Sequence, residues 1–342
     1  MHMADALLSP AVGGVMTGVS ALAIGYGVKR ISKDTLDDKK IPMMGVMGAL
    51  VFAGQMINFT IPGTGSSGHI GGGILLAALL GPFPALLTLA SVLLIQCLFF
   101  ADGGLLAYGC NVFNMGVTSC FLAFQFIFKP LIAKGMSAKG IDPPRIFIAS
   151  IAAVVVGLQA GAFCVVLETL LSGVTELPFG AFLLLMQPIH LAIGVVEGLV
   201  TAGVLCYVHQ VRPELLHSAV ENTKLPPALS LGKILVSLLV LTVLVGGILS
   251  LFASAYPDGL EWSMEKVAGT AELEREGPVY AAAASVVEST AFMPDYGFAG
   301  NEEGSALGTA AAGIVGSIIT IVLAGGIGYI IHTLRKKTTV SV

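Results

Sequence analysis

The two residues that open the sequence, Met1 and His2, form a candidate metal chelate. A free amine on Met1, the deprotonated amide nitrogen of His2 and the His2 imidazole are three nitrogens within one short segment. They close fused five- and six-membered chelate rings in a plane, an arrangement that Ni(II) and Cu(II) accept as part of a tetragonal nitrogen site. The spacing therefore points to binding of a divalent metal ion, provided that another segment supplies the fourth ligand.

A glycine-rich segment, residues 62–73, contains the histidine best suited to that role. It reads PGTGSSGHIGGG and holds His69 in a flexible setting, where the backbone can approach another segment closely. His69 is a natural fourth nitrogen for the chelate, and Ser67 beside it is a candidate supporting residue. The alternative is that His69 lies at the polar start of a helix and binds no metal.

Five further polar residues lie in or next to apolar stretches. Asp102 falls in a turn, and Asn111 and Asn114, three residues apart, share one face of a helix. Buried amides need hydrogen-bond partners. These two amides either orient a metal-bound histidine or form hydrogen bonds to a neighbouring helix.

His190 and Glu197 lie one heptad apart on one helical face. An ionisable residue at membrane depth is a candidate for function. They either assist binding or gating, or form an internal pair that locks helix packing.

The composition places these residues in a membrane protein. The 342 residues are 55% hydrophobic and 11% charged, whereas soluble domains carry about 25% charged residues. The five cysteines have no CxxC spacing and are expected to be small buried hydrophobes. We therefore predict an all-α, polytopic membrane protein.

Apolar runs predict nine membrane spans, because about 20 such residues cross a bilayer. We place the spans near residues 11–28, 42–61, 70–82, 84–100, 105–128, 146–171, 179–208, 230–253 and 307–331. The third is short and is either a broken helix or part of a hairpin. Basic residues concentrate in cytoplasmic loops, and an outer N-terminus with an inner C-terminus puts all of them inside except Lys266 and Arg275. This N-out, C-in topology also brings Met1, His2 and His69 to the same outer face.

The chain divides into a seven-span body, residues 1–210, and a second module, residues 230–342. A proline-containing cytoplasmic linker, residues 211–229, joins them. The second module is one span, an outer loop of residues 254–305 and a last span. That loop carries many more acids than bases, and because the acids are spaced apart we expect it to dock on the body rather than to bind metal.

Two features are missing from the sequence. Residues 1–10 lack the basic region of an ordinary signal peptide, and a bulky second residue disfavours removal of the initiator, so the mature chain is expected to keep Met1. The chain has no GxxxxGK[ST] motif with which to hydrolyse ATP, and no catalytic constellation stands out. We therefore expect no enzyme.

Three stretches, MHMADALLSP, GTGSSGHIGGGILLAALLGP and FADGGLLAYGCNVFNMG, resemble the substrate-binding membrane component (S component) of nickel and cobalt energy-coupling-factor (ECF) transporters, the CbiM/NikM family. The stretch YPDGLEW, residues 256–262, resembles the signature of its small companion, CbiN/NikN. The chain is thus similar to a fusion of both over nearly its whole length.

The resemblance implies a metal held by the amine of Met1, the amide nitrogen and imidazole of His2, and His69. It also implies seven spans in the first part, a transmembrane scaffold (T) subunit and cytoplasmic ATPase (A) subunits as partners, and no nucleic acid. Function is then import of Ni²⁺ or Co²⁺ through a prokaryotic cell membrane, with the transported ion as ligand and no other cofactor. Four nitrogens in a plane favour nickel.

Two rival functions remain open from the residues alone. One is a secondary divalent-metal transporter or channel without an ATPase, and the other is a membrane metalloenzyme that uses His190 and Glu197.

Overall fold

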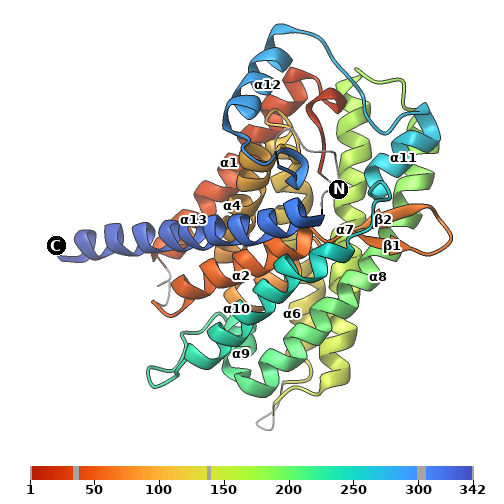
Figure 1. The fold of residues 1–342 in the computed structure, drawn as a ribbon. Coiled ribbons are helices and arrows are strands. Elements are labelled where there is room, and N and C mark those ends of the chain that lie inside the picture. Colours follow the sequence, from red (N-terminus) through yellow and green to blue (C-terminus); the bar gives the residue numbers. More distant parts are fainter. Residues whose placement is uncertain (1, 34–37, 137–139, 299–305, 341–342) are drawn as a thin grey trace.

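The computed structural model describes residues 2–33, 38–136, 140–298 and 306–340, which are almost entirely helical (Figure 1). Long apolar segments form helices because a helix satisfies its own backbone hydrogen bonds in lipid. The helices of the body are α1 (Pro10–Lys33), α2 (Lys40–Gln55), α3 (Gly73–Leu80), α4 (Pro82–Phe100), α5 (Tyr108–Asn111) continuing into the π-helical segment η2 (Val112–Phe128) and α6 (Lys129–Ala133), then α7 (Pro143–Ser172) and α8 (Phe179–Val211). The prediction of an all-α, polytopic membrane protein is confirmed.

Within the described residues, seven helices are long and apolar enough to cross a membrane, two fewer than predicted. The expected spans at 42–61 and 70–82 are the exceptions. Helix α2 has 16 residues and α3 has eight, or about 24 Å and 12 Å at 1.5 Å per residue. The segment between them leaves the helix after Gln55 and forms a hairpin, β1 (Phe59–Ile61) and β2 (Ser66–Gly68). Pro62, Gly63 and Gly65 favour the turn between the two strands.

Of the two alternatives for residues 70–82, a broken helix or part of a hairpin, the short helix α3 matches the broken helix. All eight of its residues are buried, and Gly81 separates it from α4 with a φ of 87° that few other residues adopt. Its amino end follows directly from the segment that carries His69. Helix α3 therefore holds that segment inside the body.

The C-terminal part packs against the body along α2. Its elements are α9 (Pro213–Glu221), α10 (Gly232–Gly247), η3 (Leu249–Phe252), α11 (Gly259–Ala268), α12 (Pro278–Thr290), η4 (Pro294–Tyr296) and α13 (Ala306–Val340). Helices α10 and α13 contact α2 and each other. Their backbones meet at Gly246 and Gly313, and a Cβ atom on Gly313 would have no room. Figure 1 shows α13 crossing the long helices, with its carboxyl end beyond the rest of the molecule.

The linker is tied to the start of α2. The Lys39 ammonium donates to the carbonyl oxygens of Pro226, Pro227 and Leu229 at 2.6, 2.7 and 2.8 Å. The same region contains helix α9, so the linker is partly helical. The domain boundaries at 210 and 230 remain a prediction.

Candidate metal centre

The N-terminal segment enters the body alongside the start of α5. The backbone N–H of Met3 donates to Asn111 Oδ1 at 2.7 Å, and Asn111 Nδ2 donates to the Met3 carbonyl at 3.2 Å. Gly104 N–H donates to the same carbonyl, and Asp5 Oδ1 accepts from Ala107 N–H. The Asn111 side chain therefore binds the backbone of Met3, next to His2, and makes neither of the two contacts considered from the sequence, an imidazole or a neighbouring helix. Met1 lies outside the described residues.

His2 and His69 come together in the structure. Their rings are stacked, with centroids 5.1 Å apart and 16° between the planes. Both line a cavity of about 580 Å³ near the N-terminus of the chain. In His69, Nδ1 lies 3.0 Å from the Ile70 carbonyl oxygen, so Nδ1 carries the proton and Nε2 keeps the lone pair that a metal needs. The structure therefore brings together the two predicted histidines.

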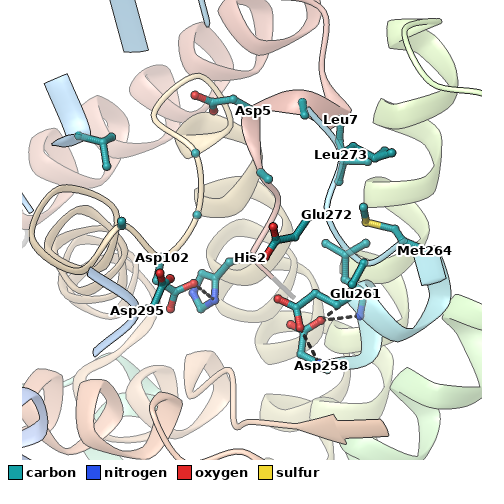
Figure 2. A pocket seen from close by; sticks show the side chains of 18 of the residues that line it. His2, Asp5, Leu7, Asp102, Asp258, Glu261, Met264, Glu272, Leu273 and Asp295 are labelled. Atoms are coloured by element: carbon teal, nitrogen blue, oxygen red, sulfur yellow. Dashed lines mark hydrogen bonds and ion pairs between the residues drawn. The ribbon is translucent and has the colours of Figure 1, made fainter. Parts of the chain in front are cut away.

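Asp102 lies directly beside His2, as Figure 2 shows. Its Oδ1 is 3.2 Å from His2 Nδ1, and its Oδ2 accepts from the Tyr296 hydroxyl at 2.5 Å. The other His2 nitrogen, Nε2, is buried, and the Gln96 side chain lies within interaction distance of the ring. The nearby side chain of Gln96 is buried in the same way. Sequence reasoning found Asp102 and missed Gln96.

Both imidazoles are neutral in the folded protein at neutral pH. Burial lowers the pKa of His2 below its usual value, against an opposing effect of Asp102. Burial also lowers the pKa of His69 to about 3. Neutral imidazole is the form that binds metal ions, so these two rings need lose no proton to become ligands.

The segment that follows His69 is held on two sides. Gln55 Nε2 on α2 donates to the Gly71 carbonyl at 2.9 Å, and Gly72 N–H donates to Glu197 Oε1 on α8 at 2.8 Å. Gly72 has a φ of 75°, which suits glycine. Glu197 therefore acts on the His69 loop.

His190 does not pair with Glu197. Its Nδ1 lies 2.8 Å from the Met186 carbonyl of its own helix, and no hydrogen bond joins His190 to Glu197 in the described part of the chain. The expectation of an internal pair that locks helix packing is therefore wrong. The cause is the Gly71–Gly72 backbone, whose N–H group takes the Glu197 carboxylate.

Asn114 links two helices behind the N-terminal segment. Its Nδ2 donates to Glu168 Oε2 on α7 at 2.7 Å and lies 3.6 Å from the sulfur of Met3. Of the two uses expected for this amide, the structure has interhelical hydrogen bonding. Glu168 gave no signal in the sequence, because its partner lies 54 residues away.

The outer loop of the C-terminal part docks on the His69 loop. Ser67 N–H donates to the Pro257 carbonyl at 2.8 Å, and Ser67 Oγ donates to the Tyr256 carbonyl at 2.7 Å. Trp262 Nε1 donates to the Thr64 carbonyl at 3.0 Å. The prediction that this loop docks on the body is confirmed, and Ser67 is one of its contact points rather than a partner of His69.

Glu272 and Asp295 of the outer loop line the cavity, and this docking adds two more carboxyl groups to its wall, those of Asp258 and Glu261. Figure 2 shows them across the cavity from Asp102, with His2 in between. Asp258 and Glu261 form a capping box at the start of α11. The YPDGLEW stretch marked the motif, but its sequence did not indicate that Asp258 faces the histidines.

No group of three or more His, Cys, Asp or Glu side chains among the described residues is arranged to hold a metal ion. The predicted ligand set is of a different kind, because it combines two imidazoles with two main-chain nitrogens.

The comparison with protein families decides where the chain belongs. Residues 2–215 match the family described as the cobalt uptake substrate-specific transmembrane region, and residues 232–333 match the PDGLE domain. The chain belongs to the cobalt uptake family. Its C-terminal PDGLE domain contains four acidic residues of the cavity wall, Asp258, Glu261, Glu272 and Asp295.

Relatives within the cobalt uptake family include fused proteins. One, from Archaeoglobus fulgidus, carries the name of a fused nickel transport protein, NikMN; it is 32% identical over 94% of this chain and 96% of its own length. The cobalt transport protein CbiM of Geobacter sulfurreducens is 31% identical over 63% of this chain and 61% of its own. A crystal structure of a truncated transition metal transporter is 28% identical and superposes with a TM-score of 0.53, covering 62% of this chain and 99% of that one. The chain is therefore a multi-pass metal transport protein and not an enzyme, as predicted.

Proposed function

We propose that the chain is the substrate-binding component of an energy-coupling-factor transporter and captures Ni²⁺ or Co²⁺ at His2 and His69. The ligands are the amine of Met1, the amide nitrogen and Nδ1 of His2, and Nε2 of His69. The observation that carries this proposal is the stacked pair of neutral imidazoles in one cavity. Four nitrogens in a plane suit nickel, so nickel is the preferred cargo.

Asp102 has a defined part in this site. Among the imidazole nitrogens of His2, Nδ1 is the one that closes a six-membered ring with the His2 amide. A metal bound there replaces the 3.2 Å contact between Nδ1 and Asp102. Asp102 then remains as a carboxylate next to the bound ion. Residues that support a metal site in this way commonly alter affinity 10–100-fold.

Transport requires partners in this proposal. The chain has no P-loop motif of its own, so energy comes from cytoplasmic ATPase subunits that act through a transmembrane scaffold. The N-terminus and the cavity face outward, and the ends of α8 and α13 face the cytoplasm. ATP hydrolysis by the partners then exposes the bound metal to the inside.

The proposal is tested with the full-length protein in detergent. Wild type is expected to bind one Ni²⁺ and to show the visible absorption of a square-planar Ni(II) complex. A variant with an uncleaved extension before Met1 should lose this spectrum and bind far more weakly, because the amine becomes an amide. Unchanged affinity in the extended variant would disprove the chelate. Uptake into vesicles without the ATPase would instead favour a secondary transporter.

A further inference from the structure

We propose that Asp258, in the C-terminal PDGLE domain, belongs to the metal site of the N-terminal body and supplies negative charge that offsets the bound cation. This inference rests on the proposed function, and it adds a specific role for the fused domain. The metal site is then shared between the two parts of the chain.

The first support is the position of Asp258. It lines the same cavity as His2 and His69, and with His69 and His190 it lines a second, smaller cavity beside the first. The backbone next to it is pressed against α8: a Cβ atom on Gly259 would lie 2.9 Å from Ile193 Cδ1 and 3.1 Å from His190 Cε1. Glycine at this position therefore permits the approach that brings Asp258 to the histidines.

The second support is that the Asp258 side chain is fixed in place. Its Oδ1 accepts from Leu260 N–H at 2.7 Å and Glu261 N–H at 2.9 Å. Glu261 Oε2 in turn accepts from Asp258 N–H at 2.9 Å. Together with the bonds from Ser67 to Tyr256 and Pro257, these contacts hold the carboxylate beside the His69 loop.

The third support is the charge balance of the site. A divalent ion bound to one deprotonated amide and three neutral nitrogens keeps a net charge of +1. A buried charge is costly unless a group of opposite sign compensates it. Asp102 lies on one side of His2 and Asp258 on the other (Figure 2). The carboxylate of Asp258, together with burial, raises the pKa of Glu261 to about 7, which is the response expected of a carboxyl group beside a negative charge.

A purely structural role for Asp258 predicts something different. As a helix cap, Asp258 is replaceable by Asn, since both residues cap helices about equally well. Asp258→Asn keeps the oxygen that accepts from Leu260 and Glu261 but removes the charge. Asp258→Ser is a second neutral cap. Glu265→Gln is the matched control, because Glu265 is an exposed acid on the same helix and does not line the cavity.

The experiment measures the Kd for Ni²⁺ of the full-length protein and these variants by isothermal titration calorimetry, with the Tm of each in EDTA. Asp258→Asn and Asp258→Ser should keep the wild-type Tm within a few degrees and raise the Kd about tenfold, or about 1.4 kcal/mol. Glu265→Gln should leave the Kd unchanged. A wild-type Kd in both neutral variants would overturn the inference and leave Asp258 as a helix cap. If wild type bound neither Ni²⁺ nor Co²⁺, the proposed function itself would fail.

Discussion

The imidazole rings of His2 and His69 lie parallel at a centroid distance of 5.1 Å, although 66 residues separate them in the chain. Metal–nitrogen bonds are about 2 Å long, so nitrogens that share an ion lie within about 4 Å of each other. In the proposed site, Nδ1 of His2 and Nε2 of His69 share one ion. Asn111 positions one ring through the Met3 backbone, while Gln55 and Glu197 position the other through Gly71 and Gly72.

Removal of His69 should nearly abolish metal binding. In His69→Ala the site loses a ligand, so we expect the Kd for Ni²⁺ to rise more than about 100-fold, beyond the usual effect of a supporting residue. Equilibrium dialysis with metal analysis measures this. His217→Ala is the control, because His217 lines a separate cavity with His209 and Pro213. Equal affinity in His69→Ala and wild type would exclude His69 as a ligand.

Glu197 should matter through the His69 loop. Glu197→Leu removes the acceptor of the Gly72 N–H group and leaves that donor buried, so the Kd for Ni²⁺ should rise about 10–100-fold. Glu197→Gln keeps an oxygen acceptor and should have a smaller effect. Titration calorimetry compares the two. If the two variants weaken binding equally, the charge of Glu197 and not its hydrogen bond is what matters.

The proton release on metal binding should be smaller than the ligand count suggests. His69 has a pKa of about 3 and that of His2 is lowered by burial, so both rings are neutral at pH 7. Binding then releases protons from the amide and the amine, about two in total, given an amine pKa of about 7.7–8.0. Calorimetry in buffers of different ionisation enthalpy counts them. A count near four would mean that both imidazoles are charged before binding.

Acid should destabilise the folded protein through the same two histidines. Each folded-state pKa lies below the unfolded value of about 6.5, so the unfolded chain binds more protons between those values. The stabilising effect is complete above pH 6.5 and is lost as the pH falls toward 3. Thermal unfolding in EDTA at pH 7.5, 6.0 and 4.5 measures the decline. The variant His69→Gln should decline less steeply than wild type, and parallel curves would refute this cause.

Tyr296 should help to hold the outer loop against the body. Its hydroxyl donates to Asp102, and its ring stacks on Phe100 with centroids 5.1 Å apart. Tyr296→Phe keeps the stacking and removes the hydrogen bond, a loss of about 1 kcal/mol. Hydrogen exchange in the segment around η4 should become faster, while exchange in α7 stays the same. No change around η4 would show that the stacking alone anchors this segment.

Local chemistry and composition were enough to predict the class of protein and the two histidines. Continuous apolar runs imply membrane helices whatever their neighbours, and His69 stood out as one imidazole in a glycine-rich segment. The same reasoning did not predict the lengths of the helices within residues 42–82. Their hydropathy fits two spans, yet α2 has 16 residues and α3 is a buried helix of eight.

The surroundings of the histidines depended on contacts between distant segments. Asn114 pairs with Glu168, Glu197 binds the Gly72 backbone and Asp258 joins the cavity wall, each across 54 or more residues. A polar residue in an apolar stretch needs a partner, but its sequence position does not say which one. The sequence by itself therefore determined a mostly helical metal transport protein and the two histidines that the structure brings together. The packing of the helices and of the outer loop decided which carboxylates and amides surround them.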